Sequence, residues 1–94
     1  MIEILDNNKV ATVKEGDPCV LSFMCRSKEY SGPISYMSSC GCSTPDGPRH
    51  ITENTHFNVT VKFDSKDRKG TNKKSINITT DEGSYKASFT VNVI

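Results

Sequence analysis

The feature that most constrains this chain is an alternation of apolar and polar residues with a period of two. It is clearest between His56 and Phe63, where every second residue is Phe or Val and the residues between them are polar. Side chains of a β-strand point alternately to its two faces, so this run predicts a strand with one buried and one solvated face. The same alternation covers residues 75–79 and 85–93. Three such strands in succession predict an antiparallel sheet that is packed on one side.

The rest of the chain adds shorter strands and turns. Residues 9–14, 19–25 and 34–39 have the composition of strands, and residues 15–18 and 81–83 have that of turns. We expect a polar connection at residues 64–72 and a long irregular one at residues 40–55. No window carries the apolar repeat of a helix. The pattern predicts an all-β fold, an immunoglobulin-like antiparallel sandwich of about seven strands. A chain of 94 residues has room for one domain, residues 1–94.

The predicted core consists of the apolar side chains that share one parity on successive strands. These residues are Leu21, Phe23, Ile34, Tyr36, Phe57, Val59, Val61, Phe63, Ile76, Ile78, Ala87, Phe89, Val91 and Val93.

Composition and charge exclude several classes of protein. The formal net charge is +1 and the mean hydropathy is −0.50. The overall electrostatic potential of the chain therefore does not favour binding to nucleic acid or to a membrane surface. No stretch is long and apolar enough to span a bilayer. Residues 1–6 contain two acidic residues and no Lys or Arg, and no apolar core follows them, so we see no secretory signal.

Four cysteines, Cys19, Cys25, Cys40 and Cys42, offer three alternatives. In the absence of a secretory signal the default is free thiols, because small buried cysteines behave as ordinary apolar residues. Two disulfides in one of three pairings, or ligation of a metal, remain open. With free thiols, the stability of the fold should not depend on oxidation or on metal.

The segment Cys40-Gly41-Cys42 is the one candidate for redox or metal chemistry. His50 and His56 could complete a set of four ligands with the two cysteines, although the one-residue spacing is shorter than that of most zinc sites. The alternative is a tight turn in which one cysteine packs inward and Gly41 supplies an unusual backbone angle. We favour the turn, because nothing in the sequence orients the histidines. We therefore expect no metal and no cofactor.

Catalysis has little support in the sequence. His50 and His56 are the only histidines, and the Gly-x-Ser-x-Gly motif of serine hydrolases is absent. His56 falls on the solvated parity of its strand. We therefore predict a protein that is not an enzyme and has no catalytic residues.

A cluster of positive charge stands out in residues 62–74. This segment carries Lys62, Lys66, Arg68, Lys69, Lys73 and Lys74 against Asp64 and Asp67, a local charge of +4. Such a cluster could contact phosphates or an acidic partner. It could also be a solvated loop that discourages pairing at a sheet edge, which is the reading we favour.

One motif carries a family resemblance. Residues 39–45, Ser-Cys-Gly-Cys-Ser-Thr-Pro, close a predicted strand and are followed by Val59-Thr-Val-Lys-Phe-Asp64 and Lys74-Ser-Ile-Asn-Ile-Thr-Thr80. This arrangement resembles a bacterial family of unknown function whose mark is a Ser-Cys-Gly-Cys-Thr stretch. The resemblance covers residues 10–93. It implies an immunoglobulin-like domain akin to the Hydin-type and major-sperm-protein-type modules, which serve in binding or assembly.

From the residues and the resemblance together we expect an interaction or structural module. Small accessory proteins of bacteriophage particles share this size and fold, so the expected partner is a capsid or other virion protein bound in many copies. We expect the chain in the virion or in the cytoplasm of the producing cell, without membrane or nucleic acid, and leave a homo-oligomer open. The expected contact residues lie on the two conspicuous loops: Pro45, Asp46, Pro48, Arg49, Lys66, Arg68 and Lys69. The alternative is a thiol-bearing module of the bacterial cell envelope.

Overall fold

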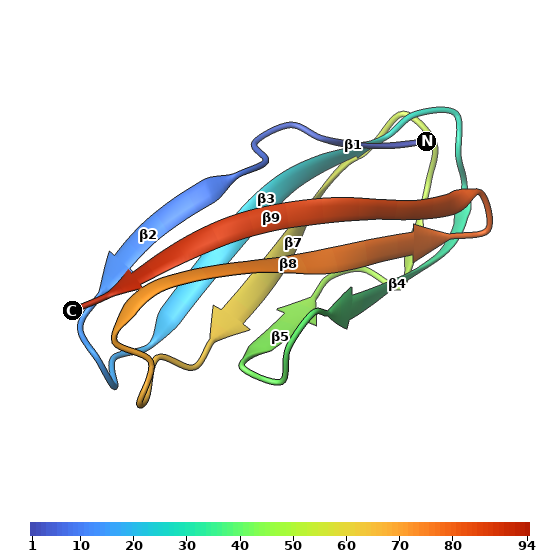
Figure 1. Ribbon diagram of the computed structural model, residues 1–94. Helices are drawn as coiled ribbons and strands as arrows, with labels where there is room; N and C mark the ends of the chain where they lie inside the picture. Colours follow the sequence, from blue (N-terminus) through green and yellow to red (C-terminus); the bar gives the residue numbers. More distant parts are fainter.

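Nine β-strands and no helix make up the computed structural model, which describes residues 1–94 (Figure 1). The predicted all-β fold is thereby confirmed. The strands are β1 (Ile2–Ile4), β2 (Lys9–Val13), β3 (Cys19–Ser27), β4 (Gly32–Ser38), β5 (Ser43–Asp46), β6 (His50–Ile51), β7 (His56–Phe63), β8 (Gly70–Thr80) and β9 (Gly83–Val93).

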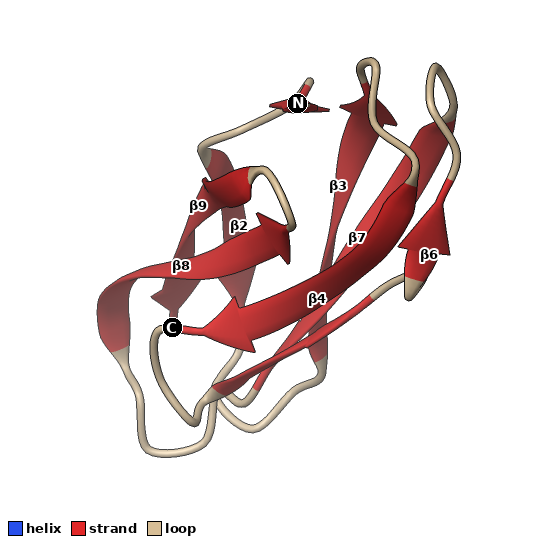
Figure 2. Ribbon diagram, turned by 90° about the vertical axis from the view of Figure 1, so that its right-hand side faces the viewer, coloured by secondary structure: helices blue, strands red, loops and turns tan.

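The strands form two sheets that pack face to face. One sheet has the order β1-β3-β7-β5. The other has the order β2-β9-β8-β4-β6, and all five of its strands are labelled in Figure 2. All neighbouring strands are antiparallel except β2 and β9, which run parallel. The chain enters one sheet as β1 and crosses to the other as β2 within a few residues. The architecture is the predicted β-sandwich.

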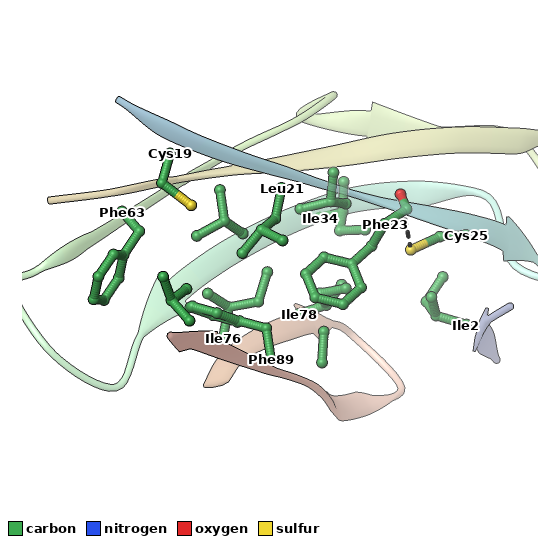
Figure 3. Packing of buried hydrophobic residues seen from close by; sticks show 14 of the residues in the cluster. Ile2, Cys19, Leu21, Phe23, Cys25, Ile34, Phe63, Ile76, Ile78 and Phe89 are labelled. Atoms are coloured by element: carbon green, nitrogen blue, oxygen red, sulfur yellow. Dashed lines mark hydrogen bonds between the residues drawn. The ribbon is translucent and has the colours of Figure 1, made fainter. Parts of the chain in front are cut away.

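The core lies between the sheets and follows the strand parity. In the β3–β7 pair Phe23 stands opposite Val59 and Leu21 opposite Val61, and all four are buried. Phe89 is the centre of an aromatic group, with its ring centroid 6.3 Å from that of Phe23 and 6.4 Å from that of Phe63 (Figure 3). This register follows from the alternation of side chains between the two faces of a strand. A shift of either strand by one residue would turn its apolar side chains to the solvent.

The predicted core is confirmed with two qualifications. Every residue of that set is buried except Tyr36 and Phe57, which are half-buried and pack against the core. The structure adds buried apolar residues that the prediction did not include: Ile2, Cys19, Cys25, Tyr30, Cys42 and Ile51.

The expectation of a long irregular connection at residues 40–55 is wrong. This stretch contains β5, which pairs with β7, and β6, which pairs with β4. Both strands are short and carry Pro or polar residues, so their sequences hold no alternation that would reveal them. The backbone hydrogen bonds of neighbouring strands, not local propensity, make them strands.

The molecule is elongated, with extents of 41 × 20 × 17 Å. The N-terminus and the C-terminus of the chain lie at opposite ends of this long axis (Figure 1). The Met1 amino group pairs with Glu82 Oε1 at 2.8 Å, beside the β8–β9 turn. At the other end the Ile94 amide donates to the Val13 carbonyl at 2.9 Å, and the Ile94 carbonyl accepts from the Glu15 amide at 2.9 Å. The chain forms no helix of the length and apolarity needed to cross a bilayer.

Candidate functional site

The predicted basic loop is folded against an acidic one. The Ser65 side chain is buried, and its Oγ accepts from the Gly16 amide and donates to the Asp17 carbonyl, both at 2.9 Å. Glu15 Oε2 accepts from the Asp67 amide at 3.0 Å, and Glu15 Oε1 lies 3.7 Å from Lys69 Nζ. These contacts join residues 64–69 to residues 14–18 as one double loop.

This double loop has no excess of positive charge. Its cations are Lys14, Lys66, Arg68 and Lys69, and its anions are Glu15, Asp17, Asp64 and Asp67. Lys66 and Lys69 are exposed, whereas Arg68 is half-buried and its Nε is buried without a hydrogen-bond partner. The loop part of the positive cluster, residues 64–69, is therefore neutral together with residues 14–18. Lys62, Lys73 and Lys74 of the same cluster lie outside the double loop, on β7 and β8.

The other predicted contact residues lie on the segment between β5 and β6. The Tyr36 hydroxyl donates to the Pro48 carbonyl at 2.7 Å, and the Ile34 amide donates to the Arg49 carbonyl at 3.0 Å. Burial above all, and then Cys25 and the Asp46 carboxylate, raise the pKa of the Tyr36 phenol. Pro45 is half-buried in β5 opposite Val61, while Asp46 and Arg49 are exposed. This segment spans from one sheet to the other and closes that side of the sandwich.

Cys40 and Cys42 form a disulfide in the turn between β4 and β5. The default of four free thiols is thus wrong for this pair, and it holds for Cys19 and Cys25, which are free and buried. Burial raises the pKa of both free thiols, and for Cys25 burial together with the nearby Asp6 raises it to about 11. Thiolates are scarce at neutral pH under these conditions, which lowers the reactivity expected of the two free cysteines.

The structure does not assemble the four candidate metal ligands. His50 lies on β6 and pairs in register with Pro33, whereas His56 begins β7 in the other sheet and pairs with Arg26. Both histidines are exposed, and both candidate cysteines are in the disulfide. No group of three or more His, Cys, Asp or Glu side chains is arranged to hold a metal ion. The alternative of a tight turn with one cysteine packed inward matches the geometry, because Cys42 is buried. The expected unusual backbone angle at Gly41 is wrong, since Gly41 is not among the residues with positive φ.

An open hollow of about 550 Å³ lies beside the disulfide. Gly41 and Cys42 form one wall, and Cys19, Asp17 and Lys62 contribute to the others. The hollow thus adjoins the disulfide on the Cys42 side, where Cys42 itself is buried.

A second hollow, of about 580 Å³, lies on the outer face of the five-stranded sheet. Its walls contain three lysines, Lys73 and Lys74 from β8 and Lys86 from β9, and no acidic residue. The sequence does not reveal this site as a whole. Lys73 and Lys74 belong to the predicted positive cluster, but the hollow joins residues from four segments that are separate in the sequence. Only the strand register, which pairs Lys86 with Asn77 of β8, brings them together.

The strand β2 is a free edge of the same sheet. The backbone N–H and C=O groups of its odd-numbered residues point toward β9. This follows from the parallel pairing, in which the Val13 carbonyl accepts a hydrogen bond from the Ile94 amide. The backbone groups of Val10 and Thr12 consequently point away from β9, toward the side where no strand pairs. The Val10 side chain is also 67% exposed.

Solved structures show the same fold at low sequence identity. The chain superposes on part of a family 123 glycoside hydrolase from Clostridium perfringens with a TM-score of 0.78 and 13% identity, over 94% of this chain and 23% of that one. A GH5 xyloglucanase from Bacteroides ovatus gives 0.63 and 7%, over 100% and 19%. The chain thus spans less than a quarter of the length of these two hydrolases.

An immunoglobulin-like domain of the giant muscle protein titin matches along nearly its whole length. The TM-score is 0.51 at 19% identity, over 97% of this chain and 98% of that domain. At these identities the likeness concerns the fold alone, and it confirms the predicted immunoglobulin-like sandwich. No curated protein matches the chain in sequence. Residues 7–93, however, match the family DUF1573, described as a protein of unknown function. This match covers nearly all of the sandwich, so the chain belongs to the DUF1573 family, with an immunoglobulin-like fold.

Proposed function

We propose that this protein is a non-enzymatic interaction module that attaches to another protein through the free edge of β2. The observation that carries the proposal is the unpaired backbone of Val10 and Thr12 beside an exposed Val10 side chain. An extended segment of a partner can add to such an edge, gaining main-chain hydrogen bonds and a contact for its own side chains. The partner proposed first is the protein shell of a virion, where many copies would add avidity.

Proline substitution tests the edge without disturbing the sheet. At Thr12 the backbone N–H points to solvent, so Thr12→Pro removes a donor that the fold does not use. Thr12→Val is the matched control, since it alters the side chain and keeps the N–H. Tagged variants are expressed in the producing cells and sedimented through a density gradient. We expect wild type and Thr12→Val to travel with a large particle and Thr12→Pro to remain at the top.

Circular dichroism and thermal melting of each variant establish that the fold is intact. If folded Thr12→Pro still travels with the particle, the edge of β2 is not the contact. If wild type never leaves the top of the gradient, the virion shell is not the partner. Turnover of a substrate by the purified protein would contradict the non-enzymatic proposal as a whole.

The Cys40–Cys42 disulfide favours a second candidate, a thiol–disulfide module of the cell envelope. The disulfide lies beside an open hollow, so a dithiol could approach it. In that exchange an incoming thiolate attacks one sulfur, the other sulfur leaves as a thiolate, and a second thiol of the reductant completes the reduction. Equilibration with glutathione buffers measures the reduction potential. A potential below about −300 mV identifies a structural disulfide and removes this candidate.

A further inference from the structure

The hollow on the outer face of the five-stranded sheet has a defined shape. Asn8 and Ser39 form its two sides, and β8 and β9 form its floor. Asn7 holds one side in place, because its Oδ1 accepts from the Ser88 amide at 2.8 Å and its Nδ2 donates to the Lys86 carbonyl at 3.1 Å. The other side is held by Ser39, whose amide donates to the Ser75 carbonyl at 3.0 Å. Both sides are thus fixed to the floor by hydrogen bonds.

The three lysines of the hollow are not neutralised within the molecule. The salt bridges of the structure involve the Met1 amino group, Lys9, Arg26 and Lys69, and none involves Lys73, Lys74 or Lys86. The remaining lining is Asn8, Ser39, Ser75, Ser88, Phe89 and Thr90. Apart from the buried Phe89 this lining consists of hydroxyl and amide groups, which suit a polar, negatively charged ligand rather than an apolar one.

The register of β8 and β9 sets the spacing of the charges. Lys73 stands opposite Thr90, Ser75 opposite Ser88, and Asn77 opposite Lys86, and all these residues share the outer face. Lys73 and Lys86 therefore lie four residues apart along the sheet, which is roughly 14 Å at the rise of a β-strand. Between them lies the pair of hydroxyls of Ser75 and Ser88. Lys74 also lines the hollow, although it stands opposite Phe89 and has the parity of the inner face of β8.

We propose that this hollow binds an extended acidic segment of a protein partner, with carboxylates at positions i and i+4. In an extended chain residues four apart lie on the same side and are separated by roughly 13–14 Å, which matches the spacing of Lys73 and Lys86. The residue between them, at i+2, faces Ser75 and Ser88 and is a small polar one. This inference rests on the proposed function as an interaction module and names the chemistry of its partner.

Nucleic acid fits the hollow less well than an acidic peptide. Base stacking requires an exposed aromatic side chain, whereas the only aromatic residue in the lining, Phe89, is 2% exposed. The hollow contains no arginine, the residue whose planar fork matches phosphate oxygens in two places at once. A lysine with neighbouring hydroxyl donors matches a single carboxylate well.

Two peptides of identical composition test the spacing. The first is capped Gly-Glu-Thr-Ser-Thr-Glu-Gly, with its carboxylates at i and i+4, and the second is capped Gly-Glu-Thr-Ser-Glu-Thr-Gly, with one carboxylate moved to the opposite side. Titration of the isotope-labelled full chain is followed by NMR. We expect shifts at the amides of Ser75, Ser88 and their neighbours, and an affinity for the first peptide about threefold higher, as one exposed ion pair allows. Equal affinities would contradict the proposed geometry.

A charge-matched pair of variants tests the site. Lys73→Gln, Lys74→Gln and Lys86→Gln together should weaken binding of the first peptide by about tenfold, whereas Lys28→Gln, Lys62→Gln and Lys66→Gln together should leave it within about twofold. The three control lysines are exposed and form no salt bridge. Equal loss in both variants would mean that only net charge matters, and the site would be refuted.

Two further results separate this inference from the proposed function. A six-nucleotide thymidine strand that binds more tightly than the peptide, and at the same amides, would replace the acidic segment with nucleic acid. If the peptide fails to bind while wild type still sediments with a particle in the gradient, the proposal that the hollow binds an acidic segment is refuted and the proposal of an interaction module is kept. If the peptide binds and no particle is found, the proposal for the hollow is kept and the virion shell is rejected as the partner.

Discussion

Tyr36 shows how a single residue closes one side of the sandwich. Its hydroxyl holds the Pro48 carbonyl at 2.7 Å, and the backbone at Gly47 runs directly past the same phenol. A Cβ on Gly47 would lie 2.7 Å from the Tyr36 hydroxyl oxygen and 2.8 Å from Cζ. Any larger residue at position 47 would therefore force the Tyr36 phenol to move.

Gly47→Ala should consequently destabilise the fold. The added methyl displaces the phenol from Pro48, so we expect a loss of about 1–2 kcal/mol in the free energy of unfolding. Gly41→Ala is the control, since a Cβ there meets no atom within 4 Å, and its effect should stay within about 0.5 kcal/mol. Urea unfolding measures both. Equal effects of the two substitutions would show that the segment carries no closing contact.

The cysteines predict a distinctive thiol count. Native protein should react negligibly with a chromogenic disulfide reagent at pH 8, because Cys19 and Cys25 are buried and burial raises the pKa of both thiols. Unfolding without reductant should release two thiols, and unfolding after reduction should release four. Four thiols without reduction would mean that Cys40 and Cys42 are not joined.

Melting with and without reductant cannot replace this count. A disulfide that closes so short a loop stabilises by only about 1.5 kcal/mol in the chain-entropy relation. The residues that it joins are two apart in the sequence. The expectation that stability is insensitive to reductant could therefore hold even though the disulfide is present.

Asp6 links the acid stability of the fold to the crossing from β1 to β2. Partial burial opposes its ionisation, but Lys9 at 2.9 Å and the Met24 amide at 2.8 Å prevail and lower the pKa of the carboxyl. A lowered pKa in the folded state means that the stabilisation is present above the ordinary pKa and disappears as the pH falls through the lowered one.

Asp6→Asn should accordingly destabilise by about 1 kcal/mol at pH 7, a value kept small because the side chain is partly solvated. The difference from wild type should vanish well below the ordinary carboxyl pKa of about 4. Asp81→Asn is the control, since Asp81 is exposed and its carboxylate forms no salt bridge. Thermal melting from pH 2.5 to pH 7 measures the effect. A difference that persists unchanged at pH 2.5 would show that the charge of Asp6 is irrelevant.

At the scale of elements, the alternation of apolar and polar residues predicted those strands that have one face buried and one face exposed to solvent. The strands β3, β7 and β9 and the C-terminal half of β8 were predictable because parity and burial coincide in them. The polar first half of β8, residues 70–75, was expected in part as a loop. It is a strand because β9 supplies its backbone partners over residues 88–93.

The short elements β1, β5 and β6 could not be predicted by the same means. The strands β1 and β6, with three and two residues, are too short to show an alternation of apolar and polar residues. The proline in β5 argues against a strand. The same limit applies to the candidate site. Residues 64–69 were identified as a surface loop, but their neutralisation by Glu15 depends on a contact across about fifty residues.

The predicted contact surface at residues 45–49 is best tested without shortening this segment. Because it closes the sandwich through Tyr36 and Ile34, its removal would lower stability and binding together. Charge changes at the exposed Asp46 and Arg49 are therefore the cleaner test of that surface.

At the scale of the whole molecule, the two surfaces proposed to bind a partner segment lie on one sheet. The free edge of β2 and the lysine hollow both belong to the five-stranded sheet, and Asn8 at the side of the hollow immediately precedes β2. A partner segment that pairs with β2 could continue across the hollow without leaving this face. The four-stranded sheet supplies the other half of the core, and the disulfide-bearing turn connects the two sheets between β4 and β5.

The parallel pairing of β2 with β9 has a mechanical consequence. The two ends of the described chain lie at opposite ends of the long axis, so a pull between them draws β2 one way and β9 the other, along their common direction (Figure 1). The hydrogen bonds between these strands are then loaded side by side and must fail together rather than one after another. A domain loaded in this way resists extension up to a threshold and then yields abruptly.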